Sequence, residues 1–269
     1  MIERGRRLPA PRDGVRVTRS IAYGEGARGT LDVYRLGSAR SGTAAVSPVV
    51  VFFYGGSWRS GRKEWYRFVG TALARCGYVT AVPDYRVYPE VRYPDFLDDG
   101  ARAVCWAKDN AARFGGNPEK LFVMGHSAGA YIAAMLTLND HWLRTVNLTP
   151  DRDIAGLIGL SGPYDFLPLR SARLEEIFGS ANEAATQPIS YVSRGAPPTL
   201  LMTGARDTTV DPGNSSRLGA RLRAVGSDAT VMTYARVGHL GIVAAFARPL
   251  RFLAAVLKDV DRFIARIAQ

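Results

Sequence analysis

The stretch that decides the fold of this chain is Leu121-Phe122-Val123-Met124-Gly125-His126-Ser127-Ala128-Gly129-Ala130. Residues 121–124 have the length and apolarity of a buried strand, and residues 128–138 are rich in helix formers. The chain must therefore turn from strand to helix within very few residues, where Gly125 and Gly129 leave room because they have no side chain. Ser127 would then stand at the tip of a strained turn, which is the G-x-S-x-G arrangement of a nucleophile elbow.

The segments around this stretch alternate between strands and helices. Strands are predicted at 15–23, 30–36, 49–54, 78–82, 121–124, 154–160, 199–203 and 230–234. Helices are predicted at 65–76, 94–114, 128–138, 211–225 and 246–267. Continuous apolar strands that alternate with helices predict an α/β fold, with a mostly parallel central sheet and helices on both faces.

Length and composition favour one domain over residues 1–269, because the chain is 47% hydrophobic and shows no break in composition. Residues 1–13 are predicted to form a mobile arm. No signal peptide and no membrane span is visible, and Cys76 and Cys105 do not have the spacing of a disulfide framework or a metal site. The sequence thus predicts a soluble, cytoplasmic protein without a membrane partner.

The formal net charge of +11 raises the question of nucleic acid binding. The arginines, however, are scattered along the chain rather than grouped with aromatic residues, and no nucleic-acid-binding motif accompanies them. We therefore expect a solvated, arginine-rich surface and no nucleic acid partner, with the basic residues of the arm as the one possible exception.

A serine hydroxyl is a weak nucleophile, so Ser127 needs a histidine base nearby. Of the three histidines, His126 should point away from Ser127 and either pack or support the site residues from behind, and His141 is expected in a surface loop. His239 directly follows the last predicted strand, where a loop would place it at the carboxyl edge of the sheet. It is the predicted base.

The acid that orients this base is expected in the loop after strand 199–203. Asp207 and Asp211 compete for the role. Asp211 precedes Pro212 at a helix start, where capping explains a carboxylate, whereas Asp207 has no such structural duty. The predicted triad is therefore Ser127, Asp207 and His239, in the chain order of the α/β-hydrolases.

Backbone N–H groups that could bind an oxyanion occur in two places. One is Ala128, at the start of the helix after the elbow. The other is the loop Gly55-Gly56-Ser57-Trp58 after strand 49–54, whose glycines let the backbone approach a ligand closely.

From about residue 49 onward the chain resembles the small carboxylesterases of the α/β-hydrolase superfamily, close to the hormone-sensitive-lipase type and to kynurenine formamidases. The resemblance rests on several motifs in order: Tyr54-Gly55-Gly56-Ser57-Trp58, Asp84-Tyr85-Arg86 followed by Pro89 and Pro94, Gly125-His126-Ser127-Ala128-Gly129, Ser161-Gly162-Pro163-Tyr164-Asp165, and the Asp207 and His239 loops.

This resemblance implies an α/β-hydrolase fold without a large cap domain. It implies that the oxyanion donors are the N–H groups of Gly56, Ser57 and Ala128, and that no metal or organic cofactor takes part. The chain departs from the family at Tyr54, where histidine is usual. A tyrosine hydroxyl can also donate a hydrogen bond, so either Tyr54 holds the loop backbone in place as the histidine would, or its ring only fills space; the sequence leaves both open.

Residues 162–197 are predicted to be an insertion that covers the site. Their aromatic side chains would either line an acyl or alcohol pocket or pack as a small satellite core, and the sequence leaves both open. Tyr54, Trp58 and Leu240, beside the predicted catalytic loops, are the predicted pocket walls.

The function predicted from these features is hydrolysis of small, short-acyl carboxylic esters through an acyl-enzyme on Ser127. An arylformamidase, acting on an N-formylkynurenine-type amide with the same triad, is the alternative. A non-catalytic ligand-binding protein of the same fold is a third candidate, although it would not need all three triad residues. The substrate is expected to be a small ester or formamide, and the oligomeric state stays open.

Overall fold

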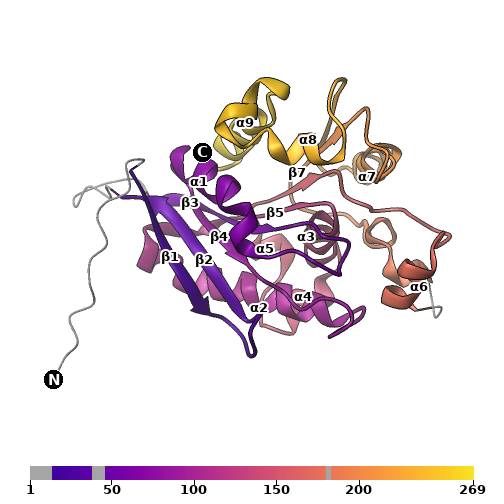
Figure 1. Ribbon diagram of the computed structural model, residues 1–269, viewed down its shortest axis with the longest axis horizontal. Helices are drawn as coiled ribbons and strands as arrows, with labels where there is room; N and C mark the ends of the chain where they lie inside the picture. The colour runs from indigo at the N-terminus through magenta and orange to yellow at the C-terminus, as the bar shows by residue number, and fades with distance from the viewer. Residues whose placement is uncertain (1–13, 38–45, 180–182) are drawn as a thin grey trace.

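The structure, a computed structural model, describes residues 14–37, 46–179 and 183–269 (Figure 1). The predicted arm, 1–13, lies outside the described residues. One eight-stranded sheet crosses the molecule in the order β1-β2-β4-β3-β5-β6-β7-β8. Its strands are β1 Val15–Ala22, β2 Thr30–Leu36, β3 Ser47–Phe53, β4 Val79–Pro83, β5 Gly116–His126, β6 Gly156–Leu160, β7 Thr199–Gly204 and β8 Ala229–Tyr234.

The sheet is mostly parallel, as the sequence predicts. Only the pairs β1–β2 and β2–β4 are antiparallel, and every pair from β4 through β3 to β8 is parallel. Strands β4, β6 and β7 are buried along their whole length, which explains why they are mostly apolar and hold no charged residue. The carboxyl ends of the parallel strands therefore share one edge of the sheet.

Helices cover both faces of the sheet. The α-helices are α1 Arg67–Arg75, α2 Asp95–Asn110, α3 Ala128–Leu138, α4 Asp140–Arg144, α5 Pro150–Asp153, α6 Ala172–Phe178, α7 Gly213–Ala224, α8 His239–Ala244 and α9 Val256–Ile267. The 3₁₀ turns are η1 Lys63–Tyr66, η2 Ala111–Phe114, η3 Glu183–Thr186, η4 Pro188–Tyr191 and η5 Arg248–Leu253. Helices α1 and α9 contact each other on one side, and α2 contacts α3 on the other (Figure 1).

Three predicted boundaries are wrong. Strand β5 begins at Gly116 rather than at the predicted residue 121, because Gly116 and Asn117 pair with the start of β3. His239 begins the short helix α8 rather than standing in a loop. The helix predicted at 246–267 is divided into η5 and α9, with extended backbone at Ala254, whose φ is −163°.

Residues 162–197, the predicted insertion, include α6, η3 and η4, and residues 180–182 lie outside the described part. Within the described ranges, no helix is long and apolar enough to cross a membrane.

Candidate active site

Ser127 lies between β5 and α3. Its backbone has φ 55° and ψ −122°, a conformation that residues other than glycine rarely adopt. The two glycines of the motif make this turn possible. A Cβ atom on Gly125 would lie 2.1 Å from the carbonyl oxygen of Gly129, and a Cβ atom on Gly129 would lie 2.1 Å from that of Phe53. The elbow predicted from the sequence therefore has a steric cause on both sides of Ser127.

The three predicted catalytic side chains lie in hydrogen-bonding contact. His239 Nε2 is 2.9 Å from Ser127 Oγ, and His239 Nδ1 is 2.8 Å from Asp207 Oδ2. The other carboxylate oxygen of Asp207 accepts the backbone N–H groups of Thr209 and Val210, at 3.0 and 2.9 Å. The carboxylate is thus fixed by its own loop and aimed at the imidazole.

The electrostatics of the site favour an ionised Asp207. Burial of its side chain raises the pKa of the carboxyl, but the hydrogen bonds from His239 and Val210 outweigh burial, and the pKa lies below its usual range. An ionised Asp207 accepts a hydrogen bond from Nδ1–H of His239, and this tautomer presents the lone pair of Nε2 to the hydroxyl of Ser127. This arrangement can remove the hydroxyl proton as the serine attacks.

Asp211, the competing acid, lies at the start of α7. Its Oδ1 accepts the N–H of Gly213 at 2.9 Å, and its Oδ2 is 3.2 Å from Arg217 Nη1. The pKa of Asp211 is lowered, mainly by the hydrogen bond from Gly213. The carboxylate thus has the helix-start duty that the sequence predicts, and it is engaged with α7 rather than with His239.

His126 supports the site from behind, which is one of the two roles that the sequence leaves open for it. It is only 1% exposed, as expected for a packed side chain, and its Nε2 is 3.0 Å from the carbonyl oxygen of His239. Because a carbonyl can only accept, Nε2 carries the proton and donates it. Burial is the main cause that lowers the pKa of His126 to about 3, and the neighbouring His239 lowers it further. The ring is therefore neutral, and its hydrogen bond fixes the backbone of His239.

The loop predicted to hold oxyanion donors passes directly beside the nucleophile. A Cβ atom on Gly55 would lie 3.0 Å from Ser127 Cβ. Gly56, Ser57 and Trp58 follow with φ values of 148°, 52° and 55°, and a Cβ atom on Gly56 would lie 2.1 Å from the carbonyl oxygen of Ser60. The close approach requires the two glycines, and the tight turn is fixed by its own backbone.

Tyr54 does not line a pocket, so that prediction is wrong, and its hydroxyl does not donate to the loop backbone, so the first of the two alternatives for its role is also wrong. Its side chain is 0% exposed, and its hydroxyl donates to Asp84 Oδ1 at 2.7 Å. The same carboxylate oxygen accepts the backbone N–H of Lys63 at 2.8 Å, and Arg28 Nη1 bridges the Tyr54 hydroxyl and the carbonyl oxygen of Gly61 at 3.3 and 3.1 Å. Tyr54 therefore supports the far end of the loop through Asp84 and Arg28.

A cavity of about 560 Å³ opens beside Ser127, Ser57 and Trp58. Trp58 lines it as predicted, while Leu240 is not among the lining residues and is 70% exposed, so the prediction of Leu240 as a pocket wall is wrong. Leu240 lies in the first turn of α8, which the sequence analysis did not predict.

The segment 162–197 contributes to both alternatives that the sequence leaves open. Phe166, Leu167 and Leu174 line the cavity, whereas Ile177 and Phe178 are buried in the core. Phe178 packs edge-on against Trp58 with ring centroids 4.9 Å apart. Among the residues that the structure describes, no group of three His, Cys, Asp or Glu side chains is placed to hold a metal.

The chain is similar to one protein family and to several proteins that are named as esterases. The profile of the family described as BD-FAE matches residues 31–222. The isoprenylcysteine alpha-carbonyl methylesterase ICME of Arabidopsis thaliana is 32% identical over 83% of this chain and 56% of its own length. Esterase LipC of Mycobacterium tuberculosis is 31% identical over 77% of this chain and 55% of its own length. The chain thus spans about half the length of these curated relatives.

Two solved structures share the fold at low sequence identity. A truncated carbohydrate esterase from gut microbiota superimposes with a TM-score of 0.79 at 18% identity, covering 96% of this chain and 98% of its own. Esterase 2 of Thermogutta terrifontis superimposes with a TM-score of 0.75 at 24% identity, and the match covers 97% of each chain. The α/β-hydrolase fold expected from the sequence is confirmed.

Proposed function

The chain belongs to the BD-FAE family, and from this membership and the geometry of the site we propose that it is a serine carboxylesterase. The observation that carries the proposal is the pair of contacts of His239, 2.9 Å from the hydroxyl oxygen of Ser127 on one side and 2.8 Å from the carboxylate of Asp207 on the other. A nucleophile, a base and an orienting acid in this geometry supply what acyl transfer needs.

In the proposed reaction, Ser127 Oγ attacks the ester carbonyl carbon while its proton moves to His239 Nε2. The imidazolium then gives this proton to the leaving alcohol, and the acyl group stays on Ser127. Water, deprotonated by the same nitrogen, releases the carboxylic acid and restores the serine. Asp207 stabilises the imidazolium in both halves of the reaction.

The negative charge that develops on the carbonyl oxygen would be bound by the backbone N–H groups of Gly56, Ser57 and Ala128. The close passage of the loop at Gly55 beside Ser127 and the tight turn at Gly56 support this assignment. Both donor segments are held by backbone geometry, so the hole would be preorganised before substrate binds.

The proposed substrate is a small carboxylic ester with a short acyl group. The apolar cavity walls at Trp58, Phe166 and Leu167 suit a compact acyl or alcohol group. An ester is preferred to the formamide alternative because the curated relatives at about 30% identity are named as esterases. A cytoplasmic location stays a prediction.

Kinetics on two substrates test the proposal. We expect wild-type protein to hydrolyse p-nitrophenyl acetate with a kcat/KM well above that for N-formylkynurenine. Ser127→Ala should lower kcat on the ester by on the order of 10⁶-fold with an unchanged melting temperature, because the hydroxyl is the nucleophile. A variant that kept a tenth of the activity would refute the role of Ser127, and faster turnover of N-formylkynurenine would assign the protein as an arylformamidase.

A further inference from the structure

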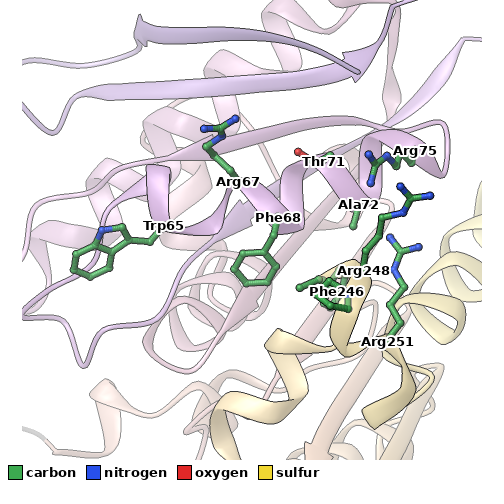
Figure 2. Close-up of a pocket in the computed structure, with 11 residues that line it drawn as sticks. Trp65, Arg67, Phe68, Thr71, Ala72, Arg75, Phe246, Arg248 and Arg251 are labelled. Atoms are coloured by element: carbon green, nitrogen blue, oxygen red, sulfur yellow. The ribbon is translucent and has the colours of Figure 1, made fainter. Parts of the chain in front are cut away.

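A second cavity, of about 510 Å³, lies between α1 and η5, and none of its lining residues belongs to the triad or the oxyanion loop. Figure 2 shows its side chains coming from two segments far apart in the sequence. Four arginines line this arginine pocket: Arg67 and Arg75 from α1, and Arg248 and Arg251 from η5.

The charge of the arginine pocket is not balanced by its own walls. None of its eleven lining residues is acidic. Within the described part of the chain, the side chains of Arg67, Arg248 and Arg251 form no hydrogen bond or ion pair. Gathering guanidinium groups on walls that hold no acidic residue raises the local positive potential, which an anion would relieve. Guanidinium groups bind phosphate through paired hydrogen bonds, so phosphate suits this pocket.

Large apolar side chains are exposed on the two segments that form the arginine pocket. Three of the six large apolar side chains that the described residues expose lie here: Trp65 at 61%, Leu250 at 37% and Phe252 at 80%. The turn η5 supplies two of them and buries none of its six residues. These side chains therefore contribute nothing to the core, and exposed apolar groups rimmed by charge mark an interaction surface.

The combination of guanidinium groups with exposed aromatic and aliphatic side chains identifies the partner. Arginines contact phosphates at the surface of a bilayer, tryptophan lies at the level of the headgroups, and Leu and Phe side chains enter the acyl boundary. A second copy of the chain is a poor partner, because a two-fold contact would bring the same arginines together. The phosphates of a nucleic acid could also bind the arginines, but a nucleic acid offers no apolar environment for Leu250.

We propose that this face binds the surface of an anionic phospholipid membrane, with headgroup phosphates in the arginine pocket and Trp65, Leu250 and Phe252 at the interface. The net charge of +11 would draw the protein to such a surface. This proposal replaces the sequence-based expectation of no membrane partner. That expectation concerned spans, whereas this surface forms only when residues near 67 and 250 meet in the fold.

Cosedimentation of the full chain with vesicles tests the proposal. We expect binding to phosphatidylcholine vesicles that contain about 30% phosphatidylglycerol, at about 0.1 M salt, and little binding to pure phosphatidylcholine. The double variant Arg248→Gln/Arg251→Gln should lower the bound fraction about tenfold. The matched control Arg113→Gln/Arg221→Gln removes two exposed charges elsewhere and should change binding by less than about twofold.

Tryptophan fluorescence provides the second readout. Anionic vesicles should shift the emission to shorter wavelength, and Trp65→Phe should abolish the shift, because the other tryptophans are at least partly buried. Equal loss of binding in the control and the Arg248/Arg251 variant would show a nonspecific charge effect and overturn the proposal. So would equal binding to uncharged vesicles, or retention on duplex DNA that depends on Arg248 and Arg251 while vesicle binding does not.

Discussion

At the scale of single residues, the backbone of Ser127 is fixed before any substrate arrives. Its N–H donates to the carbonyl oxygen of Leu160 at 2.9 Å, and its own carbonyl accepts from Tyr131 N at 3.1 Å. Strand β6 and helix α3 thus hold the unusual φ of 55° from both sides. The strain is borne by the sheet and the helix, which leaves the hydroxyl free to face His239.

The role of Asp207 can be separated from that of Asp211 by one substitution in each. Asp207→Asn should lower kcat about 10⁴-fold, because an amide at this position favours the wrong tautomer of His239. Asp211→Asn should change kcat by less than about threefold, because asparagine also caps a helix start. Steady-state kinetics on a short ester give the ranking, and the reverse order would move the acid to Asp211.

His126 should make the stability of the folded protein depend on pH. Its pKa is about 3 in the folded protein and ordinarily 6.5. Below pH 6.5 His126 is protonated in the unfolded chain but stays neutral in the folded protein. The contribution of His126 to the free energy of unfolding is therefore complete above pH 6.5 and decreases as the pH falls below this value. Between pH 7 and pH 5 the loss from this group is about 2 kcal/mol.

Urea unfolding of His126→Gln at pH 7 and pH 5 tests this dependence. The variant should lose about 2 kcal/mol less than wild type over this range. The control His141→Gln changes an exposed histidine on α4 and should keep the wild-type dependence. Identical pH dependence in His126→Gln and wild type would show that His126 is not held neutral.

At the scale of elements, the connection between β3 and α1 depends on the buried contact of Tyr54 with Asp84. Tyr54→Phe keeps the ring but removes one donor from a buried carboxylate, so we expect a loss of about 1–3 kcal/mol in the free energy of unfolding. We expect kcat to stay within about threefold of wild type, because Asp84 still accepts the N–H of Lys63 and the turn at Gly56 is closed by its own backbone.

Tyr66→Phe is the matched control for this change. The Tyr66 ring stacks on that of Tyr54, but its hydroxyl makes only a long contact, 3.5 Å, with the carbonyl oxygen of Gly55. Its removal should cost less than about 0.5 kcal/mol in urea unfolding. A Tyr54→Phe variant as stable as Tyr66→Phe, or one with kcat lowered tenfold, would contradict this account of the loop.

The elements that the sequence predicts well are those with a local cause. The conformation of a mostly apolar strand such as β7, and of the turn at the glycines beside Ser127, is determined by residues adjacent in the sequence. The start of β5 is different, because Gly116 is in a strand only through its pairing with Ser47, far away in the chain. The side-chain hydrogen bond of Tyr54 to Asp84 depends on the same kind of distant contact and was likewise missed.

At the scale of the whole molecule, parallel strands bring the site together. Strands β3, β5, β7 and β8 end at one edge, so the loop at Gly56, Ser127, Asp207 and His239 meet there although they lie far apart in the sequence. This convergence is a property of the topology, which is why the triad could be predicted from strand order. The cavity walls and the arginine pocket follow from side-chain packing, which strand order does not determine.

The most direct test of the central claim is detection of the acyl group on the protein. Wild-type protein mixed with p-nitrophenyl acetate and quenched in acid should carry an acetyl group on the peptide that contains Ser127, with a burst of about one equivalent of p-nitrophenol. Peptide mapping by mass spectrometry identifies the modified residue. An acetyl group on Ser127 that is absent in Ser127→Ala is the predicted result. Turnover without any acylated peptide, or acylation at another residue, would contradict the proposed mechanism.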